Sequence, residues 1–228
     1  MRHWAVAVSA VLAGSGAGLA PAAAQAGTVT GRITIQEKGN ASSPDLGDAV
    51  VYLVGQGISL PAARFEIAIS DKTFSPHVLV VPVGSTVTFP NHDPFDHNVF
   101  SVSDSNSFDL GLYSRGEGKA TLFRYPGLVR VFCNVHPRMV ALVLVMGTHH
   151  FAQAGGDGSF TITGVESGSY TLHVWHERAS QEFVRPVTVG PNGLADLQVT
   201  LNARGFKWQP HKNKFGKDYP TNAGRERY

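Results

Sequence analysis

Cysteine is nearly absent from this sequence, since Cys133 is the only one among 228 residues. A lone cysteine excludes an intramolecular disulfide. In an oxidising compartment, an unpaired cysteine is a liability unless the protein uses it. If the chain is exported, Cys133 is therefore a candidate for a metal ligand or a reactive thiol.

Hydrophobic runs long enough to cross a bilayer are absent after residue 26. Residues 1–26 have the features of a secretory signal: a basic start at Arg2, an apolar core that ends near Leu19, and the small residues Ala24-Gln25-Ala26 at a cleavage position. Glycines interrupt the apolar core and weaken the alternative of a retained membrane anchor. We expect a mature chain that begins near Gly27, has no stable membrane span and is periplasmic or otherwise exported.

Charge is also sparse, because Asp, Glu, Lys and Arg make up 16% of the chain. Residues 27–202 contain 11 Lys or Arg and 15 Asp or Glu, whereas residues 203–228 contain seven and two. A mildly acidic, exported body argues against nucleic-acid binding. Residues 203–228 show no sustained apolar period and are expected to form a basic flexible tail, either a solvated terminus or a docking element for an acidic partner.

The remaining composition favours an all-β protein with many turns. The chain has 25 Gly and 13 Pro, and its β-branched residues recur in short runs. Val29, Ile33 and Ile35 alternate with polar residues as in a half-buried strand, and the continuous apolar run at 140–145 is typical of a fully buried strand. About seven such short runs between residues 65 and 147 predict a β-sandwich.

Sulfur and imidazole donors are concentrated in two loops. The segment Cys133-Asn-Val-His136-Pro-Arg-Met139 places a thiolate, an imidazole and a thioether three residues apart, and His97 precedes another short apolar run. Two imidazoles, one thiolate and a weak axial thioether are the donor set of a type 1 (blue) copper centre. The pattern predicts one copper ion per chain, bound by His97, Cys133, His136 and Met139. The alternatives are a buried structural cysteine and a core methionine.

Residues 65–147 resemble a cupredoxin. The resemblance rests on His97-Asn98-Val99, on the turn Tyr125-Pro126-Gly127, and on the short Cys-x-x-His-x-x-Met spacing found in amicyanin and pseudoazurin-like proteins. It implies a Greek-key β-sandwich over residues 63–150.

The same resemblance implies how the copper ligands are surrounded. The backbone N–H of Asn98 is expected to donate a hydrogen bond to the Cys133 sulfur and so to tune the redox potential. Pro137 has no N–H, so a second donor from that position is absent. His136 is expected to reach the surface as the electron port, within an apolar patch to which Pro94, Phe95, Pro137 and Met139 could contribute.

The flanking segments resemble a second family, the carboxypeptidase regulatory-like (transthyretin-like) β-sandwiches. Gly27-Thr-Val-Thr-Gly31 with Ala49–Leu53 looks like the start of such a domain, and Asp157–Val174 looks like its continuation. The resemblance implies a discontinuous sandwich of residues 27–62 and 151–202, into which the cupredoxin domain is inserted at a surface loop. The arrangement is similar to bacterial exported proteins labelled methylamine-utilisation or plastocyanin-like, a label that is no evidence for methylamine chemistry here.

These features favour a single-electron carrier that is not an enzyme and that exchanges electrons with an unidentified redox-protein donor and acceptor. One alternative is a copper-binding or copper-delivery protein without electron-carrier duty, although three methionines are few for the Met/His-rich clusters of copper chaperones. Another is an enzyme with Cys133 as nucleophile and His136 as base, for which no orienting third residue is evident. A binuclear copper site is excluded, because it needs a second cysteine.

A second metal site is left open by four further histidines: His77, His92, His149 and His150. His77 is interpreted as a structural residue at a strand end, and His92 as part of a turn capped by Asn91 and Asp93. His149 and His150 would point to opposite faces if they lie on one strand, which argues against a shared metal.

Overall fold

The computed structural model describes residues 26–41, 43–55 and 60–219. The predicted signal segment therefore lies outside the described residues, except for its last position. The described chain is built from strands and three short 3-10 turns, at Lys38–Asn40, Leu46–Asp48 and Asp104–Asn106. Within these residues, no helix has the length and apolar character that crossing a bilayer requires. The predicted all-β fold class is confirmed.

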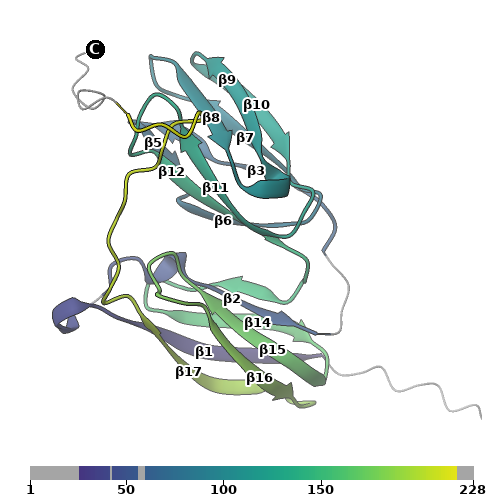
Figure 1. Cartoon of the computed structure of the whole chain (residues 1–228). Coiled ribbons are helices and arrows are strands. Elements are labelled where there is room, and N and C mark those ends of the chain that lie inside the picture. The colour runs from purple at the N-terminus through teal and green to yellow at the C-terminus, as the bar shows by residue number, and fades with distance from the viewer. Residues whose placement is uncertain (1–25, 42, 56–59, 220–228) are drawn as a thin grey trace, which may run out of the picture.

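Two five-stranded sheets form a first sandwich, the upper one in Figure 1. One sheet has the order β10-β7-β4-β5 with β3 beside β7, and its strands are β3 (Arg64–Glu66), β4 (Ala68–Ser70), β5 (Thr73–Ser75), β7 (Thr86–Asn91) and β10 (Gly116–Leu122). The other has the order β6-β12-β11-β8-β9, and its strands are β6 (Val78–Pro82), β8 (His97–Ser101), β9 (Phe108–Tyr113), β11 (Gly127–Cys133) and β12 (Val140–Met146). Side chains from both sheets share one apolar core, which includes Phe74, Phe89, Val99, Phe123 and Val131.

The other strands form a second sandwich, the lower one in Figure 1. Its three-stranded sheet has the order β14-β1-β17, with β1 (Gly27–Gln36), β14 (Ser159–Val165) and β17 (Leu194–Asn202). Its four-stranded sheet has the order β13-β2-β15-β16, with β2 (Val50–Val54), β13 (Phe151–Gln153), β15 (Gly168–Trp175) and β16 (Phe183–Val189). Strands before and after the first sandwich in sequence thus surround one core. The transthyretin-like character of these sheets and the domain boundaries stay predictions.

Gly31 lets β1 lie between β14 and β17. A Cβ at this position would be 2.3 Å from the carbonyl oxygen of Leu197 and 2.7 Å from Cζ of Phe160. Real Cβ atoms do not approach other atoms so closely, so a side chain here would push the neighbouring strand or the Phe160 ring away. This close approach is the physical reason for the second glycine in the Gly27-to-Gly31 segment.

Strand β12 is apolar throughout because both of its faces are covered. Successive side chains of a strand point to opposite faces. Ala141, Val143 and Val145 lie in the core of the first sandwich, whereas Leu142, Leu144 and Met146 lie in a separate cluster with Val50 of β2, and half-buried Trp175 packs against that cluster. The two sandwiches therefore pack on each other through this third cluster. The buried strand predicted from the run at 140–145 is confirmed.

Residues 203–219 leave β17 in the second sandwich and cross to the first sandwich without forming strands (Figure 1, yellow). The imidazole of His211 stacks on the ring of Phe132, with centroids 4.3 Å apart and planes 19° apart. The backbone N–H of Lys214 donates to Oδ1 of Asn134 at 2.9 Å. The sequence predicts a flexible tail, whereas the described part of it makes side-chain-specific contacts. These contacts come from isolated aromatic and amide groups, which leave no apolar period in the sequence.

Candidate metal centre

Strand pairing brings the predicted donors together. Cys133 is the last residue of β11 and pairs with Val99 of the antiparallel neighbour β8. His97 is the first residue of β8, so it lies beside Cys133 although 36 positions separate the two in sequence. His136 follows Cys133 in the loop between β11 and β12.

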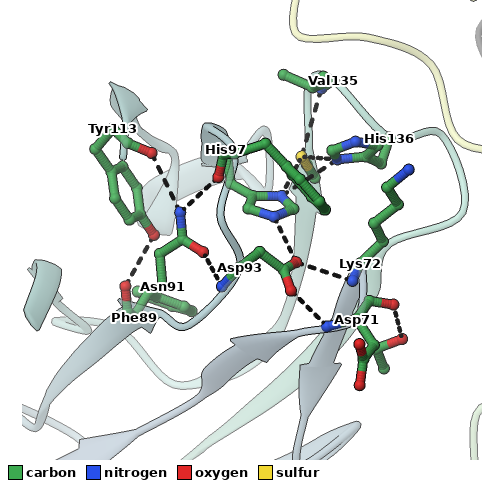
Figure 2. Close-up of polar contacts among 12 residues, drawn as sticks. Asp71, Lys72, Phe89, Asn91, Asp93, His97, Tyr113, Val135 and His136 are labelled. Atoms are coloured by element: carbon green, nitrogen blue, oxygen red, sulfur yellow. Dashed lines mark hydrogen bonds and ion pairs between the residues drawn. The ribbon is translucent and has the colours of Figure 1, made fainter. Parts of the chain in front are cut away.

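The donor atoms of these three residues converge (Figure 2). Sγ of Cys133 is 3.6 Å from Nδ1 of His97 and 3.6 Å from Nδ1 of His136, and the two Nδ1 atoms are 3.2 Å apart. These distances define a triangle whose centre lies about 2.0 Å from each corner, close to the metal–nitrogen and metal–sulfur bond lengths of about 2.0 to 2.3 Å in protein sites. The three donors therefore fit a metal ion in a trigonal arrangement, as a type 1 copper site requires.

Backbone hydrogen bonds hold Met139 beside Cys133 and His136. Its N–H donates to the carbonyl oxygen of His136 at 3.1 Å, and its own carbonyl accepts from the N–H of Cys133 at 3.3 Å. These two bonds close the loop between β11 and β12. Met139 is buried in the same apolar cluster as Cys133. The structure thus brings the donor atoms of His97, Cys133 and His136 together at the adjoining ends of β8 and β11, with the backbone of Met139 beside them.

The Cys133 sulfur lies in a dry environment that contains backbone N–H groups. Burial raises the pKa of the thiol, and the backbone N–H groups of Asn98, Val135 and His136 lower it in part. The Val135 N–H lies 3.4 Å from Sγ. The expected contribution of Asn98 is therefore accompanied by contributions from Val135 and His136, and not from position 137. A buried thiol that resists ionisation loses its proton when a metal cation binds.

Asn98 is itself held in place by polar contacts. It is buried, and its side-chain Nδ2 donates to Oδ1 of Asp109 at 2.7 Å. Its carbonyl oxygen accepts from the N–H of Asn134 at 3.0 Å. These bonds hold the backbone of β8 against the residue that follows Cys133, so the N–H that faces the sulfur has little freedom to move.

Asp93, which the sequence predicts only as part of a turn, also contacts the predicted ligand His97. Nε2 of His97 lies 2.8 Å from Oδ2 of Asp93, and both side chains are almost fully buried. A carboxylate accepts the hydrogen of Nε2, which leaves the lone pair of Nδ1 directed at Cys133 and His136. Burial lowers the pKa of His97, although the contact with Asp93 opposes this, so the neutral ring that a metal needs is favoured. The signal available in the sequence was an acidic residue four positions before a candidate ligand.

Backbone donors fix the Asp93 carboxylate (Figure 2). Its Oδ1 accepts from the N–H of Asp71 at 2.7 Å, and its Oδ2 accepts from the N–H of Lys72 at 3.0 Å. Burial raises the pKa of Asp93, but these two bonds and the contact with His97 together lower it by more, so the net shift of the pKa is downward. The N–H of Asp93 donates to Oδ1 of Asn91 at 2.9 Å, which is the turn cap expected from the sequence. The carboxylate is thus ionised and immobile beside His97.

His136 is the most exposed of the four donors, although only 8% of its surface is accessible, compared with 2% or less for the others. The centroid of the Phe95 ring lies 5.7 Å from the centroid of the His136 ring and 5.3 Å from that of the His97 ring. Pro94 is exposed and Pro137 is half-buried, so both can contribute to a surface patch, as expected. Met139 is buried and does not contribute.

Two of the other named histidines lie outside any donor cluster. Within the described ranges, groups of three or more His, Cys, Asp or Glu with converging donor atoms are His97–Cys133–His136 and His149–His150–Glu166. His92 is exposed. His77 immediately precedes β6, and its Nε2 lies 3.0 Å from Oε2 of Glu177 in the second sandwich, in keeping with a structural role.

No protein-family model and no curated protein matches the chain. Several solved structures are similar to part of it. A copper-containing nitrite reductase from Thermus scotoductus is 28% identical with a TM-score of 0.34, over 38% of this chain and 22% of that one. A purple cupredoxin from Nitrosopumilus maritimus is 24% identical with a TM-score of 0.30, over 50% and 99% of the two chains. A reduced amicyanin variant is 20% identical with a TM-score of 0.35, over 42% and 98%.

This chain spans less than a quarter of the nitrite reductase. All three TM-scores are below 0.5, so the function of these proteins is not transferred to this chain. A proposal about function has to rest on the donor atoms described above. The solved structures to which part of this chain is similar thus include cupredoxins, the family that residues 65–147 resemble.

Proposed function

We propose that the mature chain is an exported single-electron carrier with one type 1 copper ion held by His97, Cys133, His136 and Met139. The observation that carries the proposal is the convergence of one sulfur and two Nδ1 atoms, 3.2 to 3.6 Å apart, in a buried place. Bound copper would supply a one-electron Cu(I)/Cu(II) couple.

The residues around the donors hold them in one arrangement. The pairing of β8 with β11 positions Cys133, and Asp93 orients the ring of His97. Burial of the donors excludes water and keeps the thiolate from reacting with solutes. A rigid, dry donor set suits an electron carrier, because little ligand movement then accompanies each change of charge.

His136 is the candidate electron port, because it is the most exposed donor and its ring lies beside Phe95. A redox-protein donor and acceptor, both unidentified, would approach this part of the surface. The side chain of Cys133 is fully buried. Burial of the sulfur argues against a role as a catalytic nucleophile, since a substrate could not reach it. It also argues against copper delivery, which requires ligand exchange at accessible donors.

Copper loading tests the proposed centre. We expect the mature protein to bind one Cu(II) per chain, to show intense visible absorption from the thiolate–copper bond, and to bleach with ascorbate. The Cys133→Ser variant is the matched control, because it keeps the size of the side chain but removes the sulfur. A colourless copper-loaded protein, or a variant that keeps the band, would contradict a type 1 centre. Rapid copper loss with slow electron exchange would favour the delivery alternative.

Export is tested separately. When the full chain is produced in a bacterial host, we expect the periplasmic fraction to contain a protein whose first residue, determined by mass spectrometry, lies near Gly27. Recovery of the uncleaved chain in the membrane fraction would support the anchor alternative instead.

A further inference from the structure

His149 and His150 lie together where the chain passes from β12 of the first sandwich to β13 of the second. Residues 147–150 form a bend rather than a strand, so the side chains of His149 and His150 are not held on opposite faces of a sheet. The two rings are in contact, with centroids 3.6 Å apart. The bend is fixed by Thr148, whose hydroxyl donates to the carbonyl of Leu53 at 2.9 Å and accepts from the N–H of His150 at 3.2 Å.

Glu166 supplies a third donor from the turn between β14 and β15. Its Oε2 lies 3.2 Å from Nε2 of His150, and one donor atom of each of the three residues lies within 4.8 Å of the others. Two ligands of a tetrahedral zinc ion are about 3.3 Å apart, so the separation of His150 and Glu166 already suits a shared ion. His149 is half-buried, so its ring can turn to close the remaining distance.

The surroundings of the two histidines leave ring nitrogens unsatisfied. Nδ1 of His149 and Nδ1 of His150 are both buried and make no hydrogen bond among the described residues. The side chain of His150 is fully buried, whereas half of the Glu166 side chain is exposed. Buried polar atoms in folded proteins normally have a partner. An ion beside Nε2 of His150 and Oε2 of Glu166 would supply the missing partner of Nδ1 of His149, but not that of Nδ1 of His150.

We propose that His149, His150 and Glu166 bind one divalent transition-metal ion, separate from the predicted copper ion. Two imidazoles and a carboxylate suit Zn²⁺ and its neighbours among the first-row metals, and three protein ligands leave a coordination position for water. The ion ties the bend between the sandwiches to the β14–β15 turn. That turn is anchored to the second sandwich through Tyr170, whose hydroxyl donates to the carbonyl of Glu166 at 3.0 Å.

The experiment uses the copper-loaded protein, so that Zn²⁺ does not enter the first site. Calorimetric titration with Zn²⁺ is made on the unaltered protein and on His149→Ala and Glu166→Gln. Both altered side chains are at least partly exposed, so the fold is expected to survive. His77→Gln is the matched control, because His77 also pairs with a glutamate at 3.0 Å but belongs to no group of three donors.

We expect the unaltered protein to bind one Zn²⁺ per chain. The dissociation constant for Zn²⁺ should be at least about tenfold higher in each of the two site variants and unchanged in the control. Anomalous diffraction at the zinc edge of a crystal is expected to place the ion beside His150, and Zn²⁺ should raise the melting temperature of the unaltered protein but not of His149→Ala. If Zn²⁺ does not bind, or if both site variants bind it as well as the unaltered protein, the proposal is overturned. If copper does not load, the same titration is made on the Cys133→Ser protein. The test of the zinc site therefore does not depend on whether the protein is an electron carrier.

Discussion

The hydroxyl of Tyr219 donates a hydrogen bond of 2.9 Å to the backbone carbonyl oxygen of Cys133, the residue that carries the only thiol. Burial raises the pKa of Tyr219, so the phenol keeps its proton and remains a donor. The next residue in the loop, Asn134, accepts from the backbone of Lys214. The C-terminal segment therefore holds the start of the proposed copper loop from outside.

Replacing Tyr219 by Phe removes this hydrogen bond and leaves the ring. We expect the free energy of unfolding to fall by about 1 kcal/mol, the usual contribution of one hydrogen bond. Copper transfer to an excess of chelator should become faster, because the loop opens more often. The measurements are urea denaturation and the rate of copper loss. Lys217→Gln, at an exposed position nearby, is expected to change neither quantity, and equal rates for Tyr219→Phe would show that the tail does not support the loop.

Replacing Asp93 by Asn tests the carboxylate behind His97. Asp93 accepts from Asp71, Lys72 and His97, and an amide would turn a donor toward at least one of them. We expect copper affinity to fall about 10- to 100-fold, as is usual when the partner of a metal-bound histidine is lost. Competition with a chelator of known affinity measures this change.

Asp96→Asn is the matched control for this experiment. Asp96 lies in the same loop, but it is exposed and bonds to the hydroxyl of Ser114. Its replacement should leave copper affinity unchanged. If Asp93→Asn binds copper as tightly as the unaltered protein, Asp93 only shapes the loop.

Replacing His136 by Ala should abolish the strong visible absorption of the copper form, since the variant lacks one of the three converging donors. The absorption spectrum of the copper-loaded variant is the measurement. His92→Ala, which removes an exposed imidazole from the other ligand loop, is expected to keep the band. A band that survives in His136→Ala would remove His136 from the site.

The contact between His77 and Glu177 makes the packing of the two sandwiches depend on pH. The hydrogen bond with Glu177 raises the pKa of His77 above its ordinary value of 6.5, and burial opposes this in part. Because the folded-state pKa is the higher one, the stabilisation is fully present below pH 6.5 and is lost as the pH rises through the folded-state value. Both side chains are about one-third exposed, so solvent screening keeps the effect below about 1 kcal/mol.

Thermal unfolding over a range of pH tests this contact. The difference in stability between the unaltered protein and His77→Gln should be largest on the acidic side of pH 6.5 and should shrink toward alkaline pH. Glu177→Gln should give the same difference, and the double variant should add nothing to it. A difference that does not vary with pH would rule out the charged pair.

Much of the fold was readable from local patterns. Alternation of apolar residues predicted β1, and the continuous apolar run at 140–145 predicted a buried strand, which β12 is. The reason that β12 is covered on both faces was not readable, because the second cover comes from Val50 and Trp175 of the other sandwich. A run of apolar residues shows that a strand is buried but not which element buries it.

The sequence by itself determined the chemistry of the proposed copper site. Cys133, His136 and Met139 follow one another at short, regular intervals, and the properties of a thiolate, an imidazole and a thioether do not depend on the rest of the chain. Tertiary structure decided what surrounds them: Asp93 behind His97, Tyr219 on the carbonyl of Cys133, and Glu166 beside His150. Such contacts depend on strand pairing, bends and packing that bring distant residues together, and these leave no periodic signal in the sequence.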